Sequence, residues 1–322
     1  MEQNRNKWFT HEINEITFFV IFGLLMTIII PVVFGFVFGG FEESFVSGRP
    51  LQFGDILTNY LLYWILIIVA LIGLPMLKIR EMYLTKRGEH PSSQKNPRLM
   101  GVAYLHDPEQ DGLLYSMSNE LGLKKNYMRW SLSMLRMFII FTLIFGGIGI
   151  VQTITNFSFV GIPQMPFQLT SFGKVFFSAE PPAFAETMMA IFIFSLLMGI
   201  VGYLTSKYKF GKMGYFSIGF VVCSMMAILW MGYHSIVYSN SESALIATLI
   251  FGFFGSMLTL LFGSWIPWYT WHFWNNFFVK LAEVVTIRED IILVGIVVWF
   301  VLLVLYISGE YLVSKIKKKE VL

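Results

Sequence analysis

Long apolar runs are the feature of this sequence that most restricts its fold. Eight of them approach the roughly 20 residues that a helix needs to cross a bilayer. Each run is continuously apolar, whereas the strands of a membrane β-barrel alternate apolar and polar residues. We therefore predict an all-α, polytopic bundle of about eight transmembrane helices, forming a single integral membrane domain over residues 1–322. The predicted spans cover residues 17–39, 56–77, 137–156, 186–205, 215–234, 244–262, 265–279 and 291–308.

The composition excludes several other classes of protein. Only 13% of the residues are charged and 56% are hydrophobic, whereas a soluble domain carries about 25% charged residues. The single cysteine excludes an internal disulfide and a thiolate metal cluster. A net charge of +3 is too small to indicate a nucleic-acid partner, and no glycine-rich phosphate loop is present. We predict no cofactor and no metal, and membrane lipids as the surroundings of the chain.

The distribution of basic residues predicts the orientation of the bundle. With eight spans, 19 lysines and arginines fall on the side that holds both termini and four fall on the opposite side. Because basic residues accumulate in cytoplasmic loops, we predict a multi-pass protein of the cell membrane with both termini cytoplasmic. Residues 78–136 then form a cytoplasmic connector, whose stretch 111–137 has the spacing of an amphipathic helix. The proline-interrupted segment 157–185 is predicted to be an outer amphipathic or re-entrant loop.

Four polar residues are predicted to lie within the outer half of the bundle. Glu186 opens the fourth span and His234 ends the fifth, so a hairpin between these spans brings them to the same depth. His272 and Asn276 lie in the seventh span, four residues apart on one helical face. A carboxylate and an imidazole can activate a water molecule. The second imidazole and the carboxamide can donate hydrogen bonds to an oxyanion.

The order of these motifs resembles the CAAX protease and bacteriocin-processing superfamily, the glutamate-type intramembrane proteases. The shared pattern is a Glu at the start of one span, an aromatic-x-x-x-His at the end of the next, and His-x-x-x-Asn two spans later, over residues 137–290. The resemblance implies an eight-helix, metal-independent endopeptidase. It further implies that Glu186 and His234 activate water while His272 and Asn276 bind the oxyanion. Given the predicted topology, the expected substrate is a membrane-anchored or exported peptide.

The first motif departs from the family pattern, which usually has a Glu-Glu pair followed after three residues by Arg. Here Glu186 lies between Ala185 and Thr187, and no arginine occupies that place. A simpler interpretation treats Glu186 as a carboxylate at a helix N-terminus, favoured by the helix dipole. Glu180 is the alternative carboxylate, and Asn275 is the alternative to Asn276.

Other functions remain compatible with the same residues. Imidazoles and a carboxylate inside a membrane could relay protons in a proton-coupled transporter. Two histidines and one glutamate could hold zinc in a metal-dependent hydrolase. The chain could also be a non-catalytic membrane subunit that shares the layout of the motifs.

Overall fold

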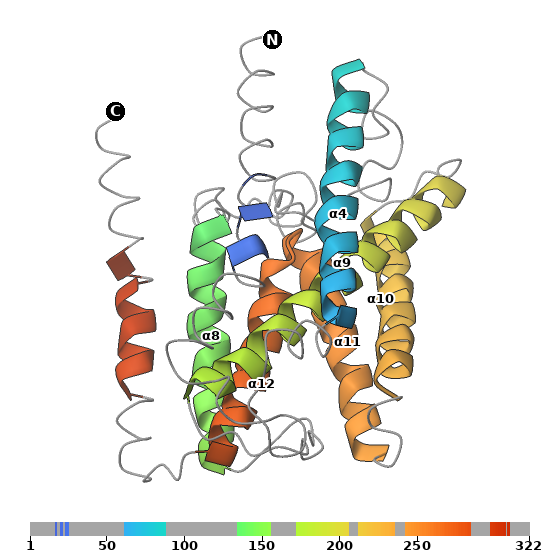
Figure 1. Cartoon of the computed structure of the whole chain (residues 1–322). Coiled ribbons are helices and arrows are strands. Elements are labelled where there is room, and N and C mark those ends of the chain that lie inside the picture. The colour runs from blue at the N-terminus through green and yellow to red at the C-terminus, as the bar shows by residue number, and fades with distance from the viewer. Residues whose placement is uncertain are drawn as a thin grey trace, which may run out of the picture.

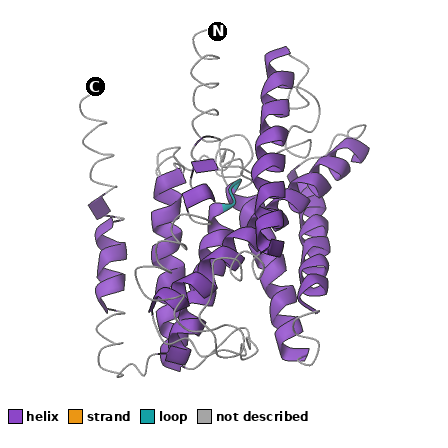
Figure 2. Ribbon diagram, viewed as in Figure 1, coloured by secondary structure: helices purple, strands orange, loops and turns teal. Residues whose placement is uncertain are grey.

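The computed structural model describes residues 17, 20–21, 23–25, 61–87, 134–155, 172–205, 212–235, 242–284, 297–306 and 308–309. Within these ranges every regular element is a helix (Figures 1 and 2). The labelled helices are α4 (Leu61–Arg87), α8 (Met134–Thr155), α9 (Phe172–Thr205), α10 (Lys212–Ser235), α11 (Glu242–Phe262) and α12 (Ile266–Val284). A further helical stretch covers residues 297–306. The predicted all-α class is therefore confirmed for the described part of the chain.

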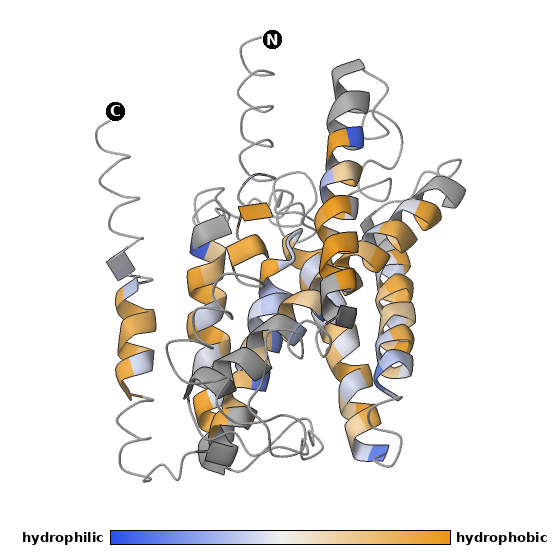
Figure 3. Ribbon diagram, viewed as in Figure 1, coloured by the Kyte–Doolittle hydropathy of each residue, from blue (hydrophilic) through white to orange (hydrophobic). Residues whose placement is uncertain are grey.

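Three helical segments in the described ranges are long and apolar enough to cross a membrane. They are Pro182–Val201 of α9, Ser217–Ser235 of α10 and Glu242–Phe262, the whole of α11. Shorter apolar helices cover Ile67–Leu77, Arg136–Val151 and Val297–Tyr306. Figure 3 shows hydrophobic residues along most of the length of these helices. The three longer segments indicate a membrane protein.

Helix α9 runs obliquely across the bundle and makes the widest set of helix contacts (Figure 1). It packs against α4, α10, α11 and α12, while α12 also packs against α8, and α10 against α11. Near the middle of α9, the ring of Phe184 meets Trp265 and Tyr269 edge-on, with centroid distances of 6.1 and 5.5 Å. All three rings are buried. Such edge-to-face aromatic pairs stabilise packing beyond the area that they bury, so this cluster fixes α9 against the start of α12.

A tight turn at Gly263–Ser264 joins α11 to α12, in the two-residue gap between the spans predicted at 244–262 and 265–279. Gly263 has a φ of 61°, a left-handed conformation that glycine adopts without a steric penalty. Its N–H donates to the carbonyl of Thr259 at 2.8 Å. The Ser264 hydroxyl accepts a hydrogen bond from the N–H of Ile266 at 3.3 Å and caps the first turn of α12. The last turn of α11 and the first turn of α12 are thereby joined without a longer loop.

Helix α9 begins earlier than the predicted span. It starts at Phe172, so residues 172–185, which we predicted as part of an outer amphipathic or re-entrant loop, form the first turns of a continuous helix. The pair Pro181–Pro182 suggested a boundary because proline removes a backbone donor. Ala179 and Ala183 on either side are fully buried, and such tertiary packing stabilises a helix against local propensity.

Several other predicted segments lie outside the described residues. These are most of the first span at 17–39, the connector beyond residue 87 with most of its predicted amphipathic helix at 111–137, and the outer segment from 157 to 171. Helix α4 extends to Arg87, ten residues beyond the end predicted for the second span.

Candidate functional site

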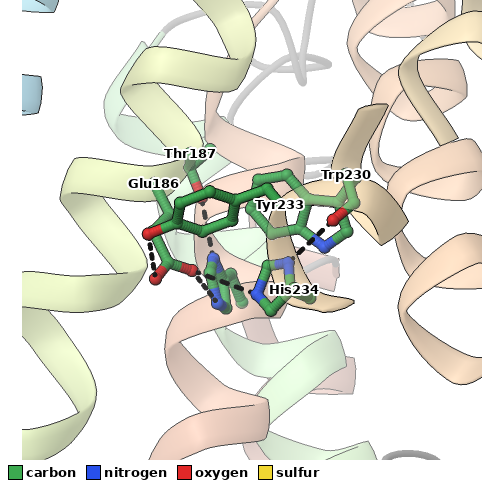
Figure 4. A network of polar contacts seen from close by, with 6 residues as sticks. Glu186, Thr187, Trp230, Tyr233 and His234 are labelled. Carbon is green, nitrogen blue, oxygen red and sulfur yellow. Dashed lines mark hydrogen bonds and ion pairs between the residues drawn. The ribbon is translucent and has the colours of Figure 1, made fainter. Parts of the chain in front are cut away.

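Three of the four predicted site residues meet inside the bundle (Figure 4). The carboxylate oxygen Oε2 of Glu186 lies 3.5 Å from Nε2 of His234 and 3.7 Å from Nε2 of His272. The side chains are almost enclosed, with 10% of Glu186, 10% of His234 and 7% of His272 exposed. One carboxylate oxygen therefore faces the Nε2 atoms of both imidazole rings, and all three side chains are largely shielded from solvent.

Each of these residues comes from a different helix. Glu186 lies in the middle of α9, His234 is the penultimate residue of α10, and His272 lies in the first half of α12. Glu186 is 14 residues beyond the first residue of α9 at Phe172, which is about four helical turns. The interpretation of Glu186 as a carboxylate stabilised at a helix N-terminus is therefore wrong, because the dipole effect is confined to the first turn.

A backbone carbonyl fixes the orientation of the His234 ring. Its Nδ1 lies 2.9 Å from the carbonyl oxygen of Trp230, one turn earlier in α10. A carbonyl only accepts hydrogen bonds, so Nδ1 carries a proton and donates it. In a neutral His234 ring, Nε2 is then an unprotonated acceptor directed at the site. In the aromatic-x-x-x-His pattern, the residue four positions before the histidine thus supplies the carbonyl that orients the ring.

The hydroxyl of Thr187 holds the other histidine. Thr187 is fully buried, and its Oγ1 lies 3.1 Å from Nδ1 of His272. No feature of the sequence pointed to Thr187, because adjacent helical residues point about 100° apart and do not usually share one contact. Here Glu186 and Thr187 reach opposite ring nitrogens of the same histidine on α12 (Figure 4).

Tyr233 is a second residue that sequence reasoning did not identify. Its hydroxyl points to Oε1 of Glu186, the carboxylate oxygen that the histidines do not face, at 3.4 Å. This separation exceeds the usual 2.5–3.0 Å of an O–H···O hydrogen bond, so the contact is weak. In the sequence, only the position of Tyr233 next to His234 pointed to it.

Aromatic rings form the apolar wall of the site. The Trp230 ring lies 4.8 Å from the His234 ring and 5.5 Å from the His272 ring, measured between centroids. The Phe251 ring of α11 packs edge-on against His272 at 5.2 Å. These contacts hold both imidazoles and lower the local dielectric constant, which strengthens the electrostatic interactions among the polar groups.

The fourth predicted residue, Asn276, is half-buried, and the structure records no hydrogen bond from it to Glu186, His234 or His272. Asn275 is buried more deeply, at 7% exposed, and lines a cavity of about 250 Å³ between α11 and α12. The other lining residues are Ser243, Ile246, Ala247, Ile250, Phe251 and Trp271. The cavity is mainly apolar. Phe251, which lines it, also packs against the ring of His272.

Within the described residues, no group of three or more His, Cys, Asp and Glu side chains has the arrangement of a metal site. The single cysteine, Cys223, is buried in α10. The polar groups that meet at the site are one carboxylate, two imidazoles and two hydroxyls.

Comparison of the chain with protein-family models, with curated proteins and with solved structures finds no match in any of the three.

Proposed function

We propose that this protein is a metal-independent, glutamate-type intramembrane endopeptidase of the CAAX protease and bacteriocin-processing superfamily. The observation that carries the proposal is the meeting of Glu186 Oε2 with His234 Nε2 at 3.5 Å and with His272 Nε2 at 3.7 Å. A cluster of one carboxylate and two imidazoles inside an apolar bundle costs free energy of folding, so such residues usually serve a function.

The first chemical step is the activation of water. A water molecule about 2.8 Å from both Glu186 Oε2 and His234 Nε2 can donate one hydrogen bond to each, since both atoms are acceptors. When the water attacks the carbonyl carbon of a peptide bond, its proton passes to this pair. The hydrogen bond from His234 Nδ1 to the Trp230 carbonyl stabilises the charge that the ring gains.

The second step requires a donor for the oxyanion that forms on the former carbonyl oxygen. We assign this role to His272, whose Nε2 faces the same space, together with Asn276 as the family resemblance implies. Collapse of the tetrahedral intermediate breaks the C–N bond, and the Glu186–His234 pair returns the proton to the leaving amine. The products are a new carboxylic acid and a new amine, so atoms and charges balance.

The proposed setting follows from the sequence. The site belongs to a single multi-pass domain of about eight spans in the cell membrane, with both termini cytoplasmic, and it opens toward the outer leaflet. The proposed substrate is a membrane-anchored or exported peptide. The apolar cavity beside His272 fits a substrate that approaches through lipid.

The test uses the purified full-length protein in detergent micelles and in liposomes, incubated with peptides derived from membrane-anchored and exported proteins. Mass spectrometry identifies the cleavage products. Glu186→Gln keeps the shape of the side chain and removes the carboxylate, and should lower the rate at least about 100-fold. Glu242→Gln, at an exposed position in the first turn of α11, is the matched control and should leave the rate unchanged.

Two further measurements make the test specific. The Glu186→Gln protein should unfold at the same or a higher temperature than the wild type, because it no longer buries a carboxylate. Treatment with EDTA should leave the rate unchanged. Equal cleavage by wild type and Glu186→Gln would refute the proposal, and loss of activity on chelation would indicate a metal-dependent hydrolase instead.

A further inference from the structure

The cavity of about 250 Å³ between α11 and α12 lies beside the candidate site without being part of it. The two helices diverge from their turn (Figure 1), and the lining residues lie away from that turn. At the rim, Ser243, Ile246 and Ile250 are exposed, whereas Phe251 and Asn275 are buried. The cavity therefore opens at the surface of the bundle and is closed at its inner end.

The inner wall connects the cavity to the candidate site. The ring of Phe251 lies 4.4 Å from the ring of Trp271 and 5.2 Å from that of His272, measured between centroids. Trp271 in turn stacks on Phe145 of α8 at 5.7 Å, so a third helix supports the wall. Successive Cα atoms of a peptide are 3.8 Å apart. A peptide whose scissile bond lies at His272 can therefore place a side chain one or two positions away in the cavity.

Asn275 gives the cavity a polar group that lacks a partner. Its side chain is only 7% exposed, and the structure records no hydrogen bond of this side chain within the described ranges. A carboxamide has two N–H donors and an acceptor oxygen, and burying these groups without partners costs free energy. Asn275 therefore indicates an occupant that can both donate and accept a hydrogen bond.

The size and lining of the cavity restrict the occupant further. An apolar cavity of about 150 Å³ can hold benzene, whereas pockets for whole small molecules usually measure about 300–1,000 Å³. The cavity between α11 and α12 falls between these sizes, which suits one large apolar side chain. A lipid acyl chain would fill the apolar walls but would leave the Asn275 amide unpaired. A peptide residue offers an apolar side chain together with a backbone N–H and C=O.

We propose that this cavity is a specificity pocket for the substrate. It takes an apolar side chain of the size of leucine, methionine or phenylalanine, one or two positions from the scissile bond, while Asn275 binds the peptide backbone beside it. The inference rests on the proposed function and deepens it, because it names the substrate class as peptides that carry such a residue close to the cleaved bond.

The first experiment measures kcat/KM for short, water-soluble peptides in which each position within two residues of the scissile bond is alanine, leucine or phenylalanine. At one of these positions the wild type should prefer leucine or phenylalanine over alanine by about tenfold or more, since the larger side chain leaves water for the pocket. Ala247→Phe places a ring in the cavity and should bring this ratio close to one. Ile228→Phe, at an exposed position of α10, is the matched control and should retain the preference.

Asn275 has a separate kinetic signature. Asn275→Leu keeps a side chain of similar size and removes the carboxamide. It should raise KM about three- to tenfold for every peptide of the series, because a contact with the peptide backbone does not depend on the side chain in the pocket. The preference for a large apolar residue should persist. An unchanged KM would show that Asn275 does not bind the substrate.

The second experiment locates the side chain directly and needs no cleavage. The full-length Glu186→Gln protein in detergent micelles is irradiated with a peptide that carries photo-leucine at the preferred position, or at each position in turn if no peptide is cleaved. Mass spectrometry should find the cross-links within residues 243–251 and 271–275. Adding Ala247→Phe to Glu186→Gln should remove these cross-links, and adding Ile228→Phe should not.

Three results would overturn the inference, and the first two do so even if no variant folds. They are a wild type that shows no size preference at any of these positions, and photo-leucine that cross-links only outside the cavity. The third is a phospholipid with a photoreactive acyl chain that labels the cavity and is not displaced by the peptide, which would assign the space to lipid.

The two proposals can fail separately. If no peptide is cleaved but photo-leucine labels the cavity and Ala247→Phe prevents it, the proposed function is wrong and the pocket stands as a peptide-binding site. If peptides are cleaved and Glu186→Gln is inactive, but the wild type and Ala247→Phe share the same size preference, the inference about the cavity alone is wrong.

Discussion

Oε2 of Glu186 lies 3.5 Å from Nε2 of His234, although the two residues are 48 positions apart in the chain. The carboxylate is used unequally: Oε2 faces both histidines, while Oε1 has the weak contact with the Tyr233 hydroxyl at 3.4 Å. Oε2, the oxygen that could share a water molecule with His234, is therefore also the one that faces His272. This asymmetry leads to a graded prediction for the neighbouring side chains.

Loss of His234 should be far more damaging than loss of the Tyr233 hydroxyl. His234→Gln removes the acceptor at Nε2 and should lower kcat by about 100-fold or more, as for a general base. Tyr233→Phe removes a contact longer than a normal hydrogen bond and should cost less than about tenfold. Steady-state kinetics on a single cleaved peptide gives both values. Similar losses in the two variants would contradict the roles assigned here.

The crossing of α11 and α12 should depend on the absence of a side chain at Gly255. A Cβ at this position would lie 2.2 Å from Nε1 of Trp268, whose ring is fully buried and cannot move aside. Gly255→Ala should therefore destabilise the protein by about 1–3 kcal/mol, less the small gain that alanine brings to a helix. Gly232→Ala is the matched control, because nothing lies within 4 Å of the added atom.

The single cysteine provides the measurement for these glycine variants. Cys223 is fully buried in α10, so a thiol-reactive dye should label it only as the protein unfolds. The temperature at which the dye signal rises should fall in Gly255→Ala and stay equal or rise in Gly232→Ala. A fall in both variants would indicate that the loss of glycine itself, and not the contact with Trp268, is responsible.

The proposed orientation can be tested with reporters fused at two positions. In a bacterial host, alkaline phosphatase should be active when fused after Ser239, between α10 and α11, and inactive when fused after Lys209, between α9 and α10, because this enzyme matures only outside the cytoplasm. A fluorescent reporter that matures only in the cytoplasm should give the opposite pattern. Activity of both phosphatase fusions would contradict the alternation of spans that the basic residues predict.

Three of the helical elements were predicted closely because they depend on local properties. The spans expected at 137–156, 215–234 and 244–262 lie within two or three residues of α8, α10 and α11. The two-residue gap between the spans predicted at 244–262 and 265–279 leaves room only for a tight turn, which Gly263 and Ser264 form. The start of α9 was not predicted, because Pro181 and Pro182 suggested a break that packing of the neighbouring alanines overrides.

The candidate site was likewise predicted only in part. The rise per residue, applied to a hairpin of the fourth and fifth spans, predicted that Glu186 and His234 lie at the same depth. Three of the four predicted residues do meet. The deeper burial of Asn275 than of Asn276 did not follow, nor did the contact of Thr187 with His272. Both depend on how far each helix is rotated about its own axis.

Hydropathy and the rise per residue therefore determined which segments become helices and how far along them each polar group lies. They could not determine the rotation of α9, because this helix is apolar on nearly all sides and shows no polar face that would reveal which side turns inward. The tertiary structure decided it through close contacts, such as those of Gly255 with Trp268 and of Phe184 with Tyr269. Those contacts turn α9 and α12 so that Glu186 and Thr187 reach the two nitrogens of one histidine, because only one rotation of each helix lets the side chains interlock.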